Sequence, residues 1–462
     1  TSNIFNILLV FGTVAIILGF IFARPFSKIL SPDLDGQWLD LATNYTRIMM
    51  FAVYAYLYSS VFRGYLNLKG DFFNPAITGI IMNVIIISFT ILSGKTGNPY
   101  LLIIGALLGN VLQYILFPKA TRKHGYHHQR VIDFTNKYVK QLMVIAIPVI
   151  ISSAAGEISI IVDNSMASAF FGKASVAKLF YAKTMLTLIT GVITVSVTTA
   201  LFPKIAELGQ AGKIGMMKKS ISSAVVTTLS LVIPAAVGMM VLSEPIIEIV
   251  FQRNAFKPED TIIVASLLGS YAPFVIFQSI TDVVDRGFYA VGDSKTPVVI
   301  VVIQQVINIA LNIILINYFG LNGLALSTVI STLLGSLMMI YKFRDNFGSF
   351  KFKSALFSIF KISIATVAMA FVASTIYRIT SDSMSHLPAM VLSILIAAII
   401  YGILILLARI PEVMELVNIL YHKIAKPRKA KKHPRNKARL DKDKRIKTEN
   451  RISHSNNKRI KK

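Results

Sequence analysis

The chain has 462 residues, of which 54% are hydrophobic and 15% charged, with a mean hydropathy of +0.64 and a formal net charge of +26. This composition excludes a soluble multidomain protein and is typical of a chain that crosses a membrane many times. The sequence contains no cysteine, which excludes disulfides, thiol catalysis and thiolate metal sites.

Apolar runs of about 18–25 residues are long enough to cross a bilayer as helices. The first run is too long for a signal peptide and has no cleavage site. The sequence therefore predicts an all-α polytopic membrane protein with twelve spans. They lie at residues 4–23, 43–62, 76–93, 100–117, 141–168, 176–201, 221–242, 262–284, 298–316, 321–341, 356–377 and 388–408.

Two motifs recur at a nearly constant spacing. RGYLNLKGDFFNP (63–75) is repeated as RGFYAVGDSKTP (286–297), and RPFSKIL (24–30) as EPIIEIV (244–250). The offsets are 286 − 63 = 223 and 245 − 25 = 220. A repeat of this size across membrane spans predicts two pseudo-symmetric helical lobes around a central cavity, as in many transporters. The second lobe begins near residue 134. Subtracting an offset of about 221 places the equivalent start of the first lobe near position −87, so we expect roughly two spans before Thr1.

The repeated motif also has a local structural interpretation. We expect Gly292 and Asp293 to form a turn, Thr296 to cap the next helix and Pro297 to occupy its first position. Asn74 and Pro75 are the equivalent pair in the first copy.

The charges indicate an orientation. Residues 422–462 contain 18 Lys or Arg against 3 Asp or Glu, with almost no apolar residues, which predicts a disordered cytoplasmic tail that contacts anionic lipid. The tail has no aromatic residues for base stacking, so we expect no nucleic acid partner. With twelve spans, the basic loops such as 118–140 fall on the cytoplasmic side, in agreement with the positive-inside rule. We divide the chain into a first lobe (1–133), a second lobe (134–345), two extra spans (346–410) and the tail (411–462).

The chain resembles a known transporter family. EPIIEIVFQRNAF (244–256), RGFYAVGDSKTP (286–297), NIALNIILIN (308–317) and GLNGLALSTVIS (320–331) occur in the order and spacing of the MviN/MurJ family of lipid II flippases. The resemblance covers residues 1–410, and the basic tail lies outside it. It implies fourteen spans, of which these twelve would be the third to the fourteenth, and an apolar groove in the last two for the polyprenyl tail of the lipid. The family belongs to the multidrug/oligosaccharidyl-lipid/polysaccharide exporter superfamily.

Ionisable residues inside spans cost about 2.5–3.5 kcal/mol each near a helix centre and are functional candidates. The pyrophosphate cargo that the resemblance implies needs cationic side chains. We expect Lys183, Thr184, Arg286, Arg63 and Glu157 to contribute to substrate binding.

Four of these candidates have alternative roles. Thr184 stands where the family has an arginine, and Lys183 either supplies that charge or extends to the membrane interface. Glu157 either relays a proton or pairs with Lys183. Arg286 is expected to pair with Asp282 and Asp285 at the cytoplasmic end of its helix, or it anchors that helix at the interface, as Arg63 could do.

A second group predicts a cation site. Asn308 and Asn312 share one helix face, Asp163 supplies a carboxylate, and Thr328 lies on the following helix. Hard oxygen ligands with one negative charge suit Na⁺. The resemblance implies that some members of the family are sodium-linked, with ion ligands at the positions that match these. In this chain Asn312 stands where a carboxylate is expected. The alternative is a network in which these groups bond one another.

The sequence has no nucleophile elbow, P-loop or metal-hydrolase motif, so we predict that the protein is not an enzyme and requires no cofactor besides a candidate Na⁺ ion. The resemblance implies a flippase that moves lipid II to the outer leaflet of the bacterial cytoplasmic membrane by alternating access. Two alternatives remain: a flippase for another polyprenyl-pyrophosphate glycan, or a cation-coupled multidrug antiporter.

Overall fold

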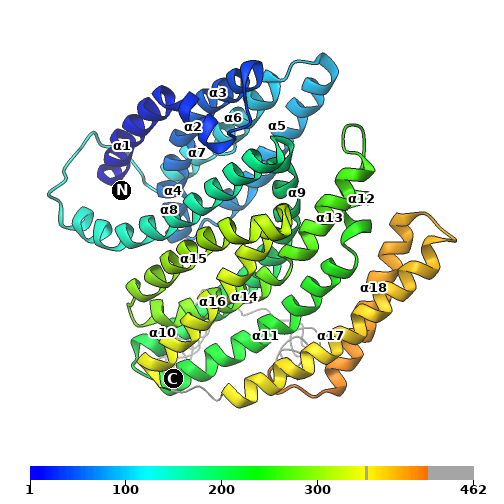
Figure 1. Cartoon of the computed structure of the whole chain (residues 1–462). Helices are drawn as coiled ribbons and strands as arrows, with labels where there is room; N and C mark the ends of the chain where they lie inside the picture. Colours follow the sequence, from blue (N-terminus) through cyan, green and yellow to red (C-terminus); the bar gives the residue numbers. More distant parts are fainter. Residues whose placement is uncertain (349–351, 415–462) are drawn as a thin grey trace, which may run out of the picture. The chain divides into compact units, whose positions relative to one another are not determined.

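Long apolar helices make up the described part of the chain, which comprises residues 1–348 and 352–414 of a computed structural model (Figure 1). No β-strand occurs in these residues. Eleven of the helices are long and apolar enough to cross a membrane. Large apolar side chains such as Phe11 (54% exposed) and Phe371 (73% exposed) cover their outer faces. A surface of this kind requires lipid as its solvent, so the predicted all-α polytopic membrane protein is confirmed.

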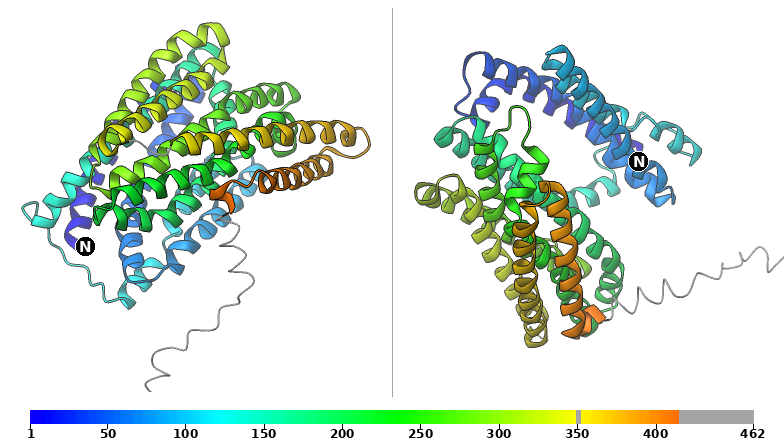
Figure 2. Two further views of the ribbon diagram at one scale, coloured as in Figure 1. Left: turned by 90° about the horizontal axis from the view of Figure 1, so that it is seen from below. Right: turned by 90° about the vertical axis from the view of Figure 1, so that its right-hand side faces the viewer.

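The first repeat contains seven helices, which are α1 (Ser2–Ile21), α2 (Ala23–Leu30), α3 (Gly36–Met50), α4 (Ala52–Leu68), α5 (Phe73–Thr96), α6 (Tyr100–Leu112) and α7 (Phe117–Lys123). The next region contains α8 (Lys137–Phe171), α9 (Ala174–Ile189), the π-helix η1 (Thr190–Thr194), α10 (Val195–Gln210), α11 (Ile214–Val241), α12 (Ser243–Phe251), α13 (Pro258–Tyr271), α14 (Pro273–Ala290), α15 (Lys295–Phe319) and α16 (Leu321–Phe347). The last two helices are α17 (Phe352–Ser381) and α18 (His386–Leu407), an antiparallel pair in Figures 1 and 2.

One predicted span differs from the expectation. Residues 43–62 are divided at Phe51 into α3 and α4, each shorter than a full span, which leaves eleven candidate spans instead of twelve. The equivalent helix of the second repeat is divided at Ala272 between α13 and α14. The two breaks are 272 − 51 = 221 residues apart, within the offsets of 220 and 223 between the sequence motifs. The repeat therefore extends to the positions at which the helices are interrupted.

The two breaks have different local causes. Pro273 has no amide hydrogen, so the carbonyl of Gly269 loses its helical partner. No proline follows Phe51, whose amide donates to the carbonyl of Ile48 instead, at 3.3 Å. Interrupted helices near the middle of a membrane are typical of transporter binding sites, because they expose backbone groups and allow bending.

The repeated motifs form matching turns. Gly70 and Gly292, 222 residues apart, both have positive φ (78° and 82°), a backbone conformation that favours glycine. After each turn an aspartate accepts from the amides that begin the next helix: Asp71 from Asn74 at 3.2 Å, and Asp293 from Thr296 at 3.0 Å. The prediction that Thr296 caps α15 was wrong. That role belongs to Asp293, because Thr296 already lies inside the helix.

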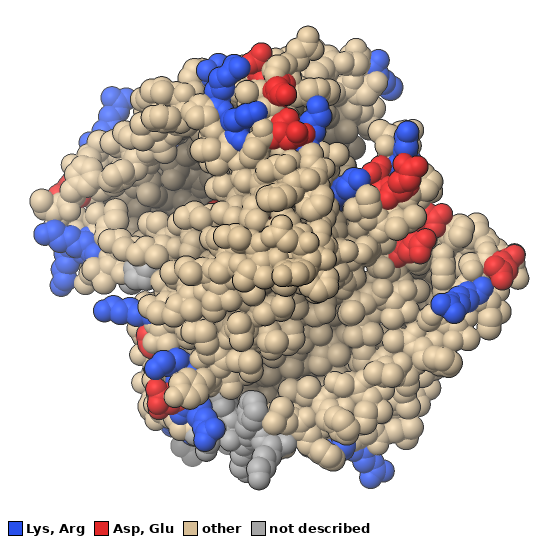
Figure 3. Space-filling model, in the orientation of Figure 1, with Lys and Arg blue, Asp and Glu red and all other residues tan. Residues whose placement is uncertain are grey.

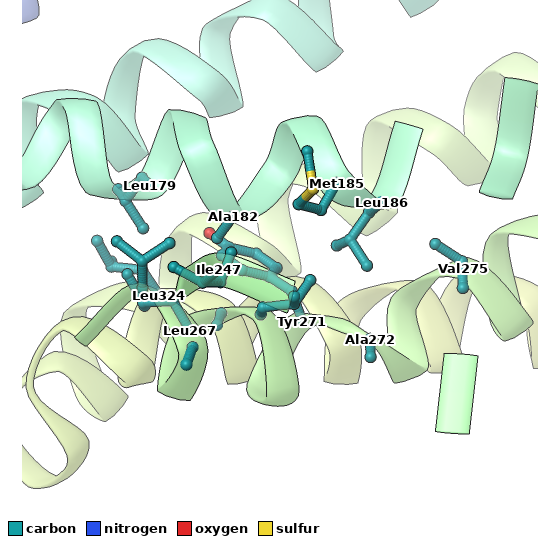
Figure 4. Packing of buried hydrophobic residues seen from close by; sticks show 14 of the residues in the cluster. Leu179, Ala182, Met185, Leu186, Ile247, Leu267, Tyr271, Ala272, Val275 and Leu324 are labelled. Atoms are coloured by element: carbon teal, nitrogen blue, oxygen red, sulfur yellow. The ribbon is translucent and has the colours of Figure 1, made fainter. Parts of the chain in front are cut away.

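A buried apolar cluster surrounds the break at Ala272 (Figure 4). Ala182 and Met185 of α9 pack against Tyr271 and Ala272. The π-helix η1 follows directly after α9, and its Thr194 hydroxyl lies 2.7 Å from the Ser279 hydroxyl of α14. π-Helical turns occur mostly at functional sites. This region thus combines a broken helix with a π-helical turn, and both elements are fixed by packing.

The hydrogen bonds between the two repeats lie where α2 and α8 end. Among the described residues, the Ser31 and Ser168 hydroxyls are 2.7 Å apart and buried, and the Asp33 carboxylate accepts from the Lys173 amide at 3.0 Å. The Ser165 hydroxyl also donates to the carbonyl of Ile29. We name Ser31, Asp33, Ser168 and Lys173 the end latch. All four residues fall in or beside the loops at 24–42 and 169–175, which the predicted order of spans places on the side opposite the basic loop 118–140.

Residues Thr1–Leu404 group into one unit and Ile405–Lys462 into a second. Within the first unit, α17 packs along α11, and the Tyr401 hydroxyl of α18 donates to the carbonyl of Ser230 at 2.5 Å. Of the second unit the structure describes only residues 405–414, so the predicted basic tail at 422–462 lies outside the described residues.

The turn between α15 and α16 is a sensitive packing point. A Cβ atom on Gly323 would lie 2.2 Å from the Leu315 carbonyl oxygen, a backbone atom. We expect Gly323→Ala to lower the free energy of unfolding by about 1–3 kcal/mol, because the backbone must shift. Gly269→Ala is the matched control, since its Cβ would meet nothing within 4 Å. Thermal denaturation of the detergent-solubilised variants tests this, and equal melting temperatures would contradict it.

Candidate functional site

A buried polar cluster joins five helices of the second repeat, α8, α9, α13, α15 and α16. The Lys183 ammonium of α9 lies 2.9 Å from Asp163 Oδ2 of α8, and Asn312 Nδ2 of α15 donates to Asp163 Oδ1 at 2.7 Å. The Asp163 side chain is only 3% exposed, whereas that of Lys183 is 30% exposed. Lys183 Nζ also lies over the face of the Tyr271 ring, 5.3 Å from its centre. Tyr271 is the last residue of α13, directly before the helix break. We name these four residues together with Asn308, Ser159 and Thr328 the polar cluster.

The remaining contacts of the polar cluster are hydrogen bonds between neutral groups. Asn308 Oδ1 accepts from the Ser159 hydroxyl at 2.6 Å, and Asn308 Nδ2 donates to the Thr328 hydroxyl at 3.3 Å. Asn312 Nδ2 is also 3.4 Å from Asn308 Oδ1. Two buried atoms have no hydrogen-bond partner, Asn312 Oδ1 and the Tyr271 hydroxyl. Buried polar atoms without a partner are rare, which marks this place as more than a packing contact.

The four predicted Na⁺ ligands are therefore brought together, but with Lys183 in place the ion does not fit beside Asp163. Asn312 and Asn308 direct amide N–H groups toward Asp163 and Thr328, and the ammonium of Lys183 already contacts the carboxylate. No group of three or more His, Cys, Asp or Glu residues able to hold a metal occurs within the described ranges. The positive charge beside Asp163 is that of Lys183.

The sequence did not indicate two members of the polar cluster. Ser159 lies four residues before Asp163 and therefore on the same helix face, which is a signal that spacing alone could have supplied. Tyr271 precedes the Ala272–Pro273 break, where a proline after an apolar run marks a helix end.

No hydrogen bond or ion pair joins the five predicted substrate residues to one another in the described part of the chain. Thr184 is half-buried, and its hydroxyl donates to the Phe180 carbonyl of its own helix at 2.7 Å. Glu157 is exposed and forms no ion pair with a described residue, and Lys183 pairs with Asp163. The structure contradicts the alternative in which Glu157 pairs with Lys183, and also the one in which Lys183 extends to the interface.

Among the described residues, neither arginine of the repeated motif forms a hydrogen bond or an ion pair with the polar cluster. Arg63 is exposed and donates to the Thr78 hydroxyl at 3.2 Å. Arg286 lies fifteen residues beyond Tyr271, roughly 20 Å along the helices at 1.5 Å per residue. We infer that both arginines lie near the C-terminal ends of their helices, at a different height along the helices from Lys183.

The predicted ion pair between Arg286 and Asp282 or Asp285 is absent from the described residues, since no nitrogen of Arg286 approaches either carboxylate within 4.0 Å. Arg286 instead stacks 5.6 Å from the Phe202 ring centre, and Asp282 accepts from Gln278 at 2.8 Å. Adjacent residues of a helix do not face each other, which explains why Asp285 does not reach Arg286.

An apolar cavity of about 270 Å³ lies between α11, α14, α16 and α17. Leu229, Ile280 and Leu337 line it, and α17 contributes Ala355 and Ile359. No residue of α18 lines this cavity, although the extra spans were predicted to form an apolar groove together. On the face seen in Figure 3, a separate hollow opens between α1 and α8, and its visible wall consists mainly of uncharged residues.

Comparison with known proteins places this geometry in a family. Residues 1–407 match the family described as "Lipid II flippase MurJ". The chain belongs to the MurJ family. Its relatives include the "Probable lipid II flippase MurJ" of Bdellovibrio bacteriovorus, 28% identical over 343 residues, and the "Lipid II flippase MurJ" of Thermosipho africanus, 28% identical over 359 residues. These alignments cover 73% and 77% of this chain, and 65% and 71% of the relatives.

A solved MurJ structure shares the fold. The "Lipid II flippase MurJ, inward closed conformation" is 26% identical, with a TM-score of 0.73, and covers 92% of this chain and 84% of that one. A multidrug resistance MATE transporter in an inward-facing conformation has a TM-score of 0.64 at 15% identity and covers 74% of this chain and 79% of that one, which shows a common fold only. The expected resemblance to the MurJ family and its two-lobe helical fold is thus confirmed. The chain spans 65% and 61% of the Bdellovibrio and Rhizobium meliloti relatives.

Proposed function

We propose that the protein translocates lipid II, the lipid-linked peptidoglycan precursor, from the inner to the outer leaflet of the bacterial cytoplasmic membrane. The match to the MurJ family over residues 1–407 carries this proposal. It makes the protein a transporter and not an enzyme. The membrane-spanning character of eleven helices agrees with a cargo that is itself held in the bilayer.

The proposed mechanism is alternating access. The hydrogen bonds between the described residues of the two repeats lie at the end latch. The hollow between α1 and α8 offers a place for a polar headgroup (Figure 3). The breaks at Phe51 and Ala272 give each repeat a position at which a helix can bend. Opening the latch while the opposite end closes would carry the headgroup across.

The proposed orientation follows from the charges. Loop 118–140 contains six Lys or Arg and one Asp, and the positive-inside rule assigns it to the cytoplasm. The end latch is then on the outside, and the tail at 422–462 is in the cytoplasm, where we propose that it contacts anionic lipid. Arg63 and Arg286, at the cytoplasmic ends of α4 and α14, are proposed to meet the lipid phosphates during entry.

We further propose that the apolar cavity beside α17 accepts the polyprenyl tail. Its lining is aliphatic and aromatic apart from Ser222 and Ser336, so it excludes a charged headgroup. We expect Ile280→Trp to lower lipid translocation roughly tenfold, because displacing about two buried CH₂ groups costs about 1.6 kcal/mol. Ile262→Trp is the control, since Ile262 is exposed on α13 and does not line the cavity. Equal translocation by both variants in vesicles would contradict the assignment.

A cellular replacement experiment tests the function. The protein is expressed in a bacterium whose own lipid II flippase can be depleted. We expect growth to continue and lipid II to become accessible to an externally added lipid II-cleaving enzyme. Accumulation of lipid II on the inner face, together with export of another polyprenyl-linked glycan or of cationic dyes, would overturn the proposal in favour of one of the two alternatives.

A further inference from the structure

The polar cluster contains oxygen atoms suited to a small cation. Asp163 contributes the one carboxylate, and the amide oxygens of Asn308 and Asn312 and the Thr328 hydroxyl lie on the neighbouring helices. Asn312 Oδ1 is buried and has no hydrogen-bond partner. Oxygen donors with a single negative charge are the ligand type that Na⁺ prefers.

A positive charge is nevertheless already in place. Lys183 Nζ lies 2.9 Å from Asp163 Oδ2 and also faces the Tyr271 ring. An ammonium is compact and comparable to a small monovalent ion in charge, and its three donors can bond oxygen atoms in varied directions. A second cation at this carboxylate would be repelled by the first at close range, in surroundings where water screens little.

We propose that Lys183 is a tethered cation that occupies a latent Na⁺ site formed by Asp163, Asn308, Asn312 and Thr328. The lysine satisfies the carboxylate permanently, so the protein does not bind Na⁺ there. Shortening the side chain removes the charge and vacates space beside Asp163, which converts the same oxygen atoms into a site for Na⁺. Only the consequence for transport, that translocation needs no Na⁺ gradient, rests on the proposed function.

The test measures binding and not transport. Melting temperatures of the purified protein are compared in NaCl, KCl and choline chloride at equal ionic strength. We expect the wild type to show no Na⁺-specific shift. Lys183→Ala is expected to melt about 2 °C or more higher in NaCl than in KCl, as ligand binding to the folded state requires.

Two controls isolate the site. Lys178→Ala removes another lysine of α9 that pairs with an aspartate, Asp260, at 2.8 Å, and should create no Na⁺ response. The double variant Asp163→Asn/Lys183→Met removes both charges of the polar cluster and should also show none.

Each outcome decides the question. A Na⁺-specific shift in the wild type overturns the proposal, whether or not the variants fold. So does a Lys183→Ala protein that melts equally in NaCl and KCl, or one that is equally unfolded in both. A Lys183→Ala protein that is recovered folded only from Na⁺ buffers supports it. The binding result is independent of the cellular experiment. Failure of the lipid II assignment would therefore neither support nor contradict the latent Na⁺ site.

Discussion

Cysteines in place of Ser31 and Ser168 are expected to form a disulfide that stops translocation. The two hydroxyl oxygens are 2.7 Å apart and buried, close to the sulfur separation of about 2.05 Å in a disulfide. Because these residues belong to different repeats and lie at the end latch, the bond would prevent that end from opening. We expect nearly complete loss of lipid translocation after oxidation and recovery after reduction, with the linked peptides identified by mass spectrometry.

The 462 residues contain no cysteine, so no other thiol among them can compete with the introduced pair. Ser27→Cys/Thr46→Cys is the matched control, because its hydroxyls are 3.2 Å apart but both belong to the first repeat. That disulfide should leave translocation intact. If the Ser31–Ser168 disulfide formed quantitatively and translocation continued, the end latch would not need to open, and alternating access through this end would be wrong.

Lys183→Ala is expected to destabilise the protein far more than Asp163→Asn, although both changes break the same ion pair. Without the lysine, the buried carboxylate of Asp163 keeps only its bond from Asn312, and loss of one partner of a buried pair costs about 3–5 kcal/mol. Without the carboxylate, Lys183 can extend its partly exposed side chain toward water, and the asparagine at 163 can still accept from Asn312. We expect a cost of about 1–2 kcal/mol for Asp163→Asn.

Both variants are compared with the wild type by thermal denaturation in potassium buffer, so that Na⁺ cannot replace the missing charge. Asp163→Asn/Lys183→Met should lie within about 1.5 kcal/mol of the wild type, because no buried charge remains unpaired. Equal losses for the two single variants would mean that Asp163 is hydrated in the folded protein, in conflict with its burial.

The sequence predicted the architecture well because the repeat is a long-range regularity that can be read directly. The offset between the motifs around Arg63 and Arg286 applies equally to the turns at Gly70 and Gly292. The interrupted helices were harder to predict, since the apolar runs at 43–62 and 262–284 continue through both breaks. Pro273 is visible in the second run, but nothing comparable follows Phe51 in the first.

The polar cluster shows where sequence reasoning stops. Glu157 and Asp163 are six residues apart on α8, which places them about 120° apart around the helix, so only one of them can face α9. The spacing does not say which one does. That depends on how α8 is rotated against its neighbours, and the structure turns Asp163 inward to Lys183 and leaves Glu157 exposed. The stacking of Arg286 on Phe202 depends in the same way on tertiary packing.

The unequal causes of the two helix breaks bear on the history of the protein. Two halves related by internal duplication inherit their shared features from a single-copy ancestor, so an interruption found in both copies is older than the duplication. Because only one copy has the proline, the bend does not depend on that residue for its persistence.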